Sequence, residues 1–326
     1  MKQNNYLLNF LKVTFFALLL IATSPVRAEI KVVTTIKPLH SLIANVMDGV
    51  GEPSLIIEDS TSPHSFTLKP SHAKLLEEAD LIFWVGEGIE TFMERPLESI
   101  VKNAEVVEFM EVESIEKLKF REESIYGDHD DHDDHDEDHD GHDDHDDHDD
   151  HAGHDGHNHG EFDAHIWLDP MNAKEMVHEI AHELGHLDPT NKDKYEANAD
   201  ATILALDQLI EDVSKDINKD AKFVVFHDAY QYFEERFGVR AEGALTLNTD
   251  VLPGAKQIDE IQDVIKDRGV NCIFSEPQFN PKIITTIAKD TNIKTGVFDP
   301  LGANINSDKD LYFKLISNLG SELKGC

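Results

Sequence analysis

Three histidines and one aspartate occupy positions at which an α/β sheet gathers ligands. His64 lies in a loop after a predicted strand, His227 ends a strand, and Asp299 follows one. His165 belongs to the segment Asp163-Ala164-His165-Ile166-Trp167-Leu168-Asp169-Pro170. Ligands of open α/β sheets bind at the carboxyl ends of the strands, so these side chains are candidates for one site. Three imidazoles and a carboxylate suit tetrahedral Zn²⁺, whereas Mg²⁺ and Ca²⁺ prefer oxygen ligands. Histidines at such places are also common as capped or solvated residues, and spacing alone does not separate the two interpretations.

A different chemistry is possible in the run His178–His186. It contains two overlapping H-E-x-x-H sequences, which on a helix place two histidines on one face with a glutamate that could activate zinc-bound water. The extended protease motif also needs a glycine three residues after the second histidine. Pro189 takes that place after His186, and in the first copy Gly185 is followed at once by His186. Because the run is polar on most faces, a surface stripe of histidines is favoured, and an exported zinc metalloprotease remains the alternative.

Residues 128–160 form a low-complexity tract with no Lys or Arg, and with no apolar residue larger than Ala152. The tract holds sixteen acidic residues and eleven of the nineteen histidines of the chain. It cannot bury enough apolar surface to offset the loss of chain entropy, so we expect disorder. It offers many weak metal sites, and we interpret it as an auxiliary zinc scavenger, although a solvated loop with incidental affinity is the plainer alternative. Its histidines are His129, His132, His135, His139, His142, His145, His148, His151, His154, His157 and His159.

The first 28 residues have the layout of a secretory signal. Lys2 and Lys12 precede an apolar run over 13–21, and Val26-Arg27-Ala28 places small residues where a signal peptidase cleaves. The run is too short to span a bilayer, which needs roughly 20 apolar residues. We therefore expect cleavage before Glu29 and release of a soluble protein outside the cytoplasm.

Charge and cysteine content agree with export. The formal net charge is −36, and removing the three cationic residues of the signal makes it −39. Such a surface repels nucleic acid and anionic membranes and attracts cations. The two cysteines, Cys272 and Cys326, are an even pair, which in an oxidising compartment favours a disulfide. A thiolate metal site would need more sulfur ligands than the chain has.

The elements that must position these residues alternate between β-branched runs and amphipathic stretches. In the first half we predict strands at 30–36, 54–58, 81–85 and 105–109, with helices at 38–50, 71–79 (with Ser71 as N-cap) and 90–101. Helices at 172–187 and 189–217 follow the tract. In the second half we predict strands at 223–227, 239–245, 272–275 and 294–298, with helices at 229–237, 255–268, 281–291 and 308–323.

This order predicts an α/β fold of two lobes, each with a four-stranded, mainly parallel sheet flanked by helices. A long helix near 189–217 would link the lobes, and the metal site would lie in the cleft between them. The expected domains are a signal peptide at 1–28, a first lobe at 29–188, a linking helix at 189–218 and a second lobe at 219–326.

The motifs around the candidate ligands are specific in combination, and they resemble those of a known family. From about residue 30 to the C-terminus, interrupted by the tract, the chain resembles the metal-binding solute-binding proteins of bacterial ABC importers, specifically the zinc-importer (ZnuA-type) branch. The matching segments are Val33-Thr34-Thr35-Ile36-Lys37-Pro38, Pro63-His64-Ser65-Phe66, His165-Ile166-Trp167-Leu168-Asp169-Pro170, Phe226-His227-Asp228-Ala229-Tyr230, Ser275-Glu276-Pro277-Gln278 and Phe298-Asp299-Pro300-Leu301-Gly302.

The resemblance implies that His64, His165 and His227 bind zinc. The manganese branch is similar but has a glutamate at the position of His227, so the histidine points to zinc, with a manganese or other divalent metal importer as the alternative. Some zinc-branch members have a glutamate before the first ligand, where this chain has Pro63, so the fourth ligand is Asp299 or water. The resemblance also implies a periplasmic, non-enzymatic, monomeric protein that delivers zinc to an ABC permease, with other periplasmic zinc chaperones as further partners.

Overall fold

The structure is a computed structural model that describes residues 30–121, 123, 125, 161–247, 249 and 253–326. The described chain from residue 31 onward forms one compact unit. The predicted signal peptide and the histidine tract lie outside the described residues. Among the residues that are described, no helix has the length and apolar character needed to cross a membrane.

The first half of the chain forms a parallel sheet in the order β2-β1-β3-β4. Its strands are β1 (Val32–Thr34), β2 (Ser54–Leu55), β3 (Leu81–Trp84) and β4 (Glu105–Glu108). Its helices are α2 (Lys37–Val46), α3 (Pro70–Glu78) and α4 (Glu94–Ser99). β1 and β3 are fully buried, which explains the continuous apolar sequence of β3 and the β-branched residues of β1.

The second half repeats this topology in the order β6-β5-β7-β8, again with every pair parallel. The strands are β5 (Phe223–His227), β6 (Gly243–Thr246), β7 (Cys272–Ser275) and β8 (Lys294–Val297). The helices are α7 (Gln231–Phe237), α8 (Ala255–Asp267), α9 (Lys282–Thr291) and α10 (Leu311–Lys324). The predicted fold class, with two four-stranded parallel sheets flanked by helices, is confirmed.

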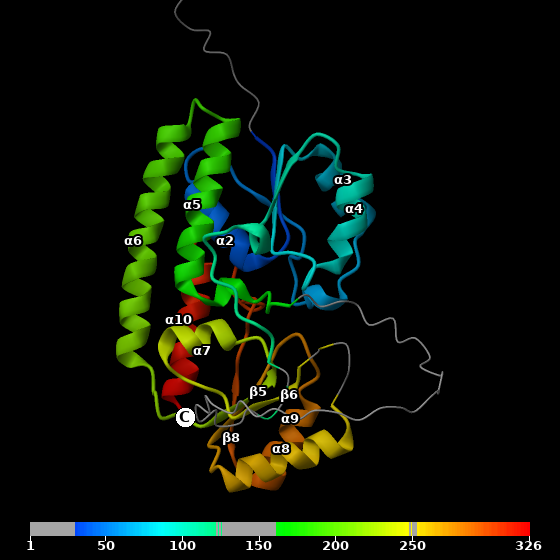
Figure 1. The fold of residues 1–326 in the computed structure, drawn as a ribbon, viewed down its shortest axis with the longest axis vertical. Helices are drawn as coiled ribbons and strands as arrows, with labels where there is room; N and C mark the ends of the chain where they lie inside the picture. Colours follow the sequence, from blue (N-terminus) through cyan, green and yellow to red (C-terminus); the bar gives the residue numbers. More distant parts are fainter. Residues whose placement is uncertain (1–29, 122, 124, 126–160, 248, 250–252) are drawn as a thin grey trace, which may run out of the picture. The chain divides into compact units, whose positions relative to one another are not determined.

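Two long helices, α5 (Pro170–Leu187) and α6 (Lys192–Asp216), stand between the two sheets in chain order and pack against each other. α6 also packs against α2 of the first half and α10 of the second, so the two halves share one set of helices (Figure 1). Its buried side chains recur at helical spacing and face these neighbours, among them Tyr195, Ala199, Leu206 and Val213.

Hydrogen bonds also join the halves near the carboxyl ends of their strands. The ammonium group of Lys37 donates to the carbonyl oxygens of Ala303 (3.0 Å) and Ile305 (3.3 Å). The indole Nε1 of Trp167 donates to the carbonyl of Pro300 at 2.8 Å, and the Tyr312 hydroxyl donates to the carbonyl of Trp167 at 2.7 Å. These groups are largely buried, so the contacts hold one half against the other.

The observed helices and strands follow the predicted order, and their ends lie within a few residues of the predicted ones. One local prediction is wrong: Ser71 is not the N-cap of α3, because the helix already begins at Pro70 and Lys69 takes the cap position. Proline suits the first helical turn, where its missing N–H is not needed. The helix therefore begins at Pro70, one residue earlier than predicted. The predicted helix at 90–101 forms as a 3-10 turn at Thr91–Met93 followed by α4.

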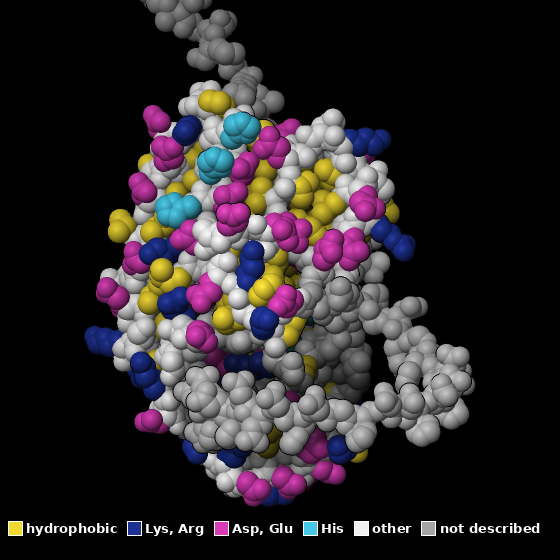
Figure 2. Space-filling view, in the orientation of Figure 1, with side chains coloured by type: hydrophobic (Ala, Val, Ile, Leu, Met, Phe, Trp, Pro, Cys, Tyr) yellow, Lys and Arg dark blue, Asp and Glu magenta, His cyan; other side chains and the backbone are white. Residues whose placement is uncertain are grey.

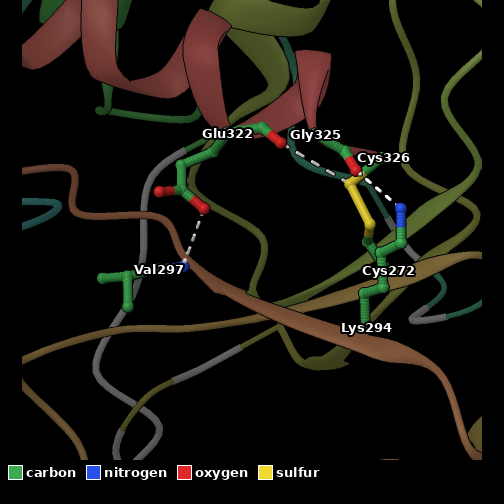
Figure 3. The surroundings of a disulfide bond; sticks show 6 residues. All are labelled: Cys272, Lys294, Val297, Glu322, Gly325 and Cys326. Carbon is green, nitrogen blue, oxygen red and sulfur yellow. Dashed lines mark hydrogen bonds between the residues drawn. A yellow bond between two sulfur atoms is a disulfide. The ribbon is translucent and has the colours of Figure 1, made fainter.

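A disulfide joins Cys272 in β7 to Cys326 at the end of the chain, as predicted (Figure 3). The ammonium group of Lys294 in β8 donates to the carbonyl of Gly325 at 2.9 Å, and Glu322 accepts from the backbone N–H of Val297. The end of α10 is therefore held on two neighbouring strands of the second sheet.

Candidate metal centre

His64 lies in a single 3-10 turn that proline begins. The turn spans Pro63–Ser65 in the segment that follows β2, and the fixed φ of proline suits its first position. The half-buried imidazole of His64 faces two other rings. Its centroid is 5.7 Å from that of His165 and 6.0 Å from that of His227.

His165 is buried and is fixed by an aspartate two residues before it. The Nδ1 atom of His165 lies 2.6 Å from Oδ1 of Asp163, and the same oxygen accepts from the His165 backbone N–H at 3.0 Å. A histidine whose Nδ1 donates to a carboxylate presents a lone pair on Nε2, the arrangement that metal-binding histidines commonly have. The short turn Ile166–Leu168 that follows, and then α5, hold this segment in place.

His227 is the last residue of β5, and a glutamate at the end of the neighbouring strand orients it. Its Nδ1 lies 2.7 Å from Oε1 of Glu276, which also accepts from the His227 backbone N–H at 3.3 Å. β5 and β7 pair in parallel, so their carboxyl ends meet and bring the two residues together. His227 and His165 thus have the same construction, although they come from different halves of the chain.

The three histidines converge on one point. The Nε2 atoms of His165 and His227 are 3.3 Å apart, and the ligand atoms of all three histidines lie within 4.8 Å of one another. A small cavity at this point is also lined by Glu276, Gln278 and Pro300. A larger cavity of about 190 Å³ lies on another side of the same three histidines and is lined further by Phe120 and Arg121.

Burial and charge give the groups of this site different proton affinities. Burial raises the pKa of Asp163 to about 7. Burial, and then the charge of His227, hold the pKa of His165 well below its usual range. Burial lowers the pKa of His227 too, but the adjacent Glu276 carboxylate, together with Asp228 and Asp163, outweighs burial and leaves that pKa raised. His165 is therefore neutral and able to bind a metal, and a metal at His227 must compete with a proton.

The structure places Asp299 differently from the three histidines. One carboxylate oxygen accepts from Gln278 Nε2 and from the backbone N–H groups of Leu301 and Gly302, at 3.0–3.2 Å. The other accepts from the backbone N–H of Ala303 at 2.6 Å. Asp299 thus shapes the loop after β8, and it is outside the group whose ligand atoms converge.

Of the two other candidate sets, one is separate from this site and the other cannot be placed. His178, His182 and His186 are exposed on α5. The tract histidines from His129 to His159 lie outside the described residues.

Sequence reasoning did not assign the orienting role of Asp163, and it named Glu276 only within the segment Ser275-Glu276-Pro277-Gln278. The i, i+2 spacing of Asp163 and His165 was the available signal for the first. Arg121 forms ion pairs with Asp228 at 2.8 Å and with Glu234 at 2.6 Å. Nothing in the sequence predicted these two ion pairs.

Two parallel α/β sheets with three convergent histidines drawn from both halves define the class of metal-binding solute-binding proteins. A family described as zinc-uptake complex component A, periplasmic (ZnuA), matches residues 32–326, and the chain belongs to this family.

Relatives named high-affinity zinc uptake system protein ZnuA support this membership. The one from Brucella abortus (strain 2308) is 48% identical over 303 residues, covering 90% of this chain and 91% of the relative. The one from Yersinia pestis is 35% identical over 321 residues, covering 97% and 98%. A solved structure described as ZnuA shares the fold with a TM-score of 0.70 and 21% identity, over 90% of this chain and 99% of that chain.

Proposed function

We propose that this protein captures Zn²⁺ outside the cytoplasmic membrane and delivers it to an ABC permease for import. The single observation that carries the proposal is the convergence of three histidine ligand atoms within 4.8 Å, two of them oriented by buried carboxylates. Family membership supplies the transport context. The zinc relatives at up to 48% identity favour zinc over manganese as the cargo.

The ligands in this proposal are His64, His165 and His227, and water completes the tetrahedral shell. Asp299 is the less favoured fourth ligand, because both its carboxylate oxygens already accept backbone N–H groups of its own loop. Recruiting it would leave those N–H groups without their acceptor in a partly buried place, at a cost of roughly 1–3 kcal/mol each. Water at the fourth position costs no such rearrangement.

The mature protein in this proposal is a monomer that begins at Glu29, works in the periplasm and receives zinc from solution or from other zinc chaperones. The tract at 128–160 serves as an auxiliary scavenger, which its eleven histidines support. Its flanks are well placed for this role. Phe120 and Arg121 line the larger cavity beside the three histidines. Lys119 forms an antiparallel β-bridge with Phe162, which lies three residues before His165.

A zinc competition assay tests the proposal. The mature chain with and without residues 128–160 is titrated against a chromophoric chelator, each with native His227 and with His227→Ala. We expect one tight site that survives deletion of the tract and weakens by at least ~100-fold in His227→Ala, because a coordinate bond is lost and Glu276 loses its partner. His178→Ala, which removes an exposed histidine of α5, is the matched control and should leave the tight site intact. Tight binding that persists in His227→Ala, or that disappears with the tract, would contradict the proposal.

A further inference from the structure

The exposed face of α5 carries a second set of metal-binding side chains that the three-histidine site does not use. His178, His182 and His186 follow each other at four-residue spacing and are all exposed. Figure 2 shows a row of histidines beside this helix with acidic side chains among them. The sequence here contains Glu-x-x-His twice in succession, as Glu179–His182 and as Glu183–His186.

The spacing places a glutamate and a histidine of each pair on one face of the helix. Residues three apart on a helix are neighbours, and Glu-x-x-His pairs are an established way for helices to hold metal ions. Glu105, the first residue of β4, adds a third ligand from a different element. The ligand atoms of Glu105, Glu183 and His186 lie within 4.8 Å of one another.

The distances within this group suit one ion with little adjustment. His186 Nδ1 and Glu105 Oε1 are 3.7 Å apart, which is too long for a good hydrogen bond. Two ligands of a tetrahedral zinc with bonds of ~2.1 Å are separated by roughly 3.4 Å. The pair is therefore spaced as ligands of a common ion would be.

His182 has a supporting position. Its Nδ1 lies 2.8 Å from Oε1 of Glu183, a hydrogen-bonding distance. His182, Glu179 and Glu183 form a second group of potential ligands that shares Glu183 with the first. Glu183 is thus held by a histidine while its carboxylate faces the other ligands, as the carboxylate ligands of metal sites commonly are.

The charge of this face also favours a cation. The Glu183 side chain is only 19% exposed, and within the described part of the chain its ion pair is with His182, while that of Glu105 is with His186. Neither carboxylate has a lysine or arginine as its ion-pair partner there. A carboxylate held largely out of water without a permanent positive partner is stabilised by a metal ion.

We propose that Glu105, Glu183 and His186 form a second Zn²⁺ site on the surface, oriented by His182 and joining β4 to α5. One imidazole with two carboxylates favours zinc over Mg²⁺ and Ca²⁺, and water fills the remaining position. The site binds zinc more weakly than the three buried histidines, because it has one imidazole instead of three and lies at the solvent-exposed surface. It gives the chain a place to hold zinc outside the three-histidine site.

Zinc-edge anomalous diffraction from crystals of the mature chain in excess zinc locates bound ions residue by residue. We expect one peak among His64, His165 and His227, which is the internal reference, and a second between Glu105, Glu183 and His186. In the double variant Glu183→Gln/His186→Gln the second peak should disappear while the first remains. The matched control is His178→Gln, which changes a histidine of the same row that belongs to neither group and should retain both peaks.

Equilibrium dialysis in solution provides an independent readout. At ~100 µM free zinc, well above the range of tight sites, the double variant should hold about one ion fewer than the native chain and than His178→Gln. The tract is the same in all three proteins and cancels in the comparison.

The inference is overturned by either of two results. One is a native crystal with no anomalous peak at α5, and the other is a double variant that keeps the peak or the full zinc count. If only the peak among His64, His165 and His227 were missing, the result would contradict the proposed function but not the second site at α5.

Discussion

At the scale of single residues, the carboxylates behind the histidines determine how the site works. Asp163 and Glu276 each hold one imidazole through Nδ1 and, through the same oxygen, the backbone N–H of that histidine. Each carboxylate therefore fixes both the ring and the chain segment that carries it. The Nε2 atoms of His165 and His227 lie 3.3 Å apart, close to the roughly 3.4 Å that separates two ligands of one tetrahedral zinc ion.

Replacing Glu276 by glutamine tests this orienting role. We expect Glu276→Gln to weaken zinc binding by 10- to 100-fold, which is typical when the hydrogen-bond partner of a ligand is changed. The measurement is a competition titration of the chain without residues 128–160. Glu242→Gln, which alters a glutamate paired with Arg268 instead of a histidine, is the control. If Glu276→Gln and the native chain bound zinc with equal affinity, Glu276 would not orient His227 for metal binding.

Another buried carboxyl, that of Glu90, makes the stability of the protein depend on pH. Burial raises the pKa of Glu90 from 4.5 to about 7, even though its Oε2 accepts the backbone N–H groups of Val85 and Gly86. Between pH 4.5 and 7 the folded state holds a proton there that the unfolded state has lost, so this group's contribution to stability falls as the pH rises.

Glu90→Gln should abolish that loss, because glutamine is neutral and can still accept both N–H groups. We expect the variant to match the native chain near pH 4.5 and to exceed it at pH 8 by up to about 3 kcal/mol in unfolding free energy. Urea unfolding of the zinc-free proteins at both pH values measures the difference. A difference that is the same at pH 4.5 and pH 8 would contradict the assignment.

At the scale of elements, the start of α5 connects the site to the rest of the fold. Asp169 is the N-cap of α5, and its Oδ1 accepts from the backbone N–H of Met171 at 2.8 Å. The same carboxylate binds Arg236 of α7 through two hydrogen bonds of 2.6 and 2.7 Å. Asp169, four residues after His165, thus caps α5 and also holds α7 of the second half.

Two substitutions at Asp169 separate these roles. Asp169→Asn keeps a capping oxygen and loses the charge, and we expect it to destabilise the fold by about 1–2 kcal/mol. Asp169→Ala loses both and leaves Arg236 without its partner, so the expected cost is about 2–4 kcal/mol. Thermal or urea unfolding gives both values. An alanine variant no less stable than the asparagine variant would show that the cap contributes nothing.

The elements also show how far the sequence could be interpreted. Strands β5 and β7 were predicted to the residue, because buried parallel strands are continuous apolar runs with clear ends. The start of α3 was missed because two capping signals, Ser71 and Pro70, compete there. The three histidines were candidates from their places at strand ends, and the family resemblance singled them out. The contact of Glu276 with His227 joins residues 49 apart and depends on strand pairing, which the sequence does not contain explicitly.

At the scale of the whole molecule, the two halves are held together on more than one side. α6 packs against α2 and α10, and Lys37 and Trp167 bond to the loop after β8. Hinge closure needs an interface that can open, and here the interface contains buried hydrogen bonds that would lose their partners.

Zinc binding should therefore leave the size of the molecule almost unchanged. We expect the radius of gyration of the chain without residues 128–160, measured by small-angle X-ray scattering, to agree within error with and without zinc. A hinge closure would instead give a clear compaction in the zinc-bound state. Lys37→Met removes the hydrogen bonds to the loop after β8 and should increase the difference in radius of gyration between the zinc-free and zinc-bound states. This variant is the control for the sensitivity of the measurement to a looser interface between the halves.

The cavity of about 190 Å³ beside the three histidines has a consequence for the path of the ion. A water molecule occupies about 30 Å³ in the liquid, so the cavity has room for several water molecules beside the three imidazoles. An ion in this cavity can therefore keep part of its hydration shell and exchange water for imidazole one ligand at a time. Stepwise exchange avoids a bare ion at any stage.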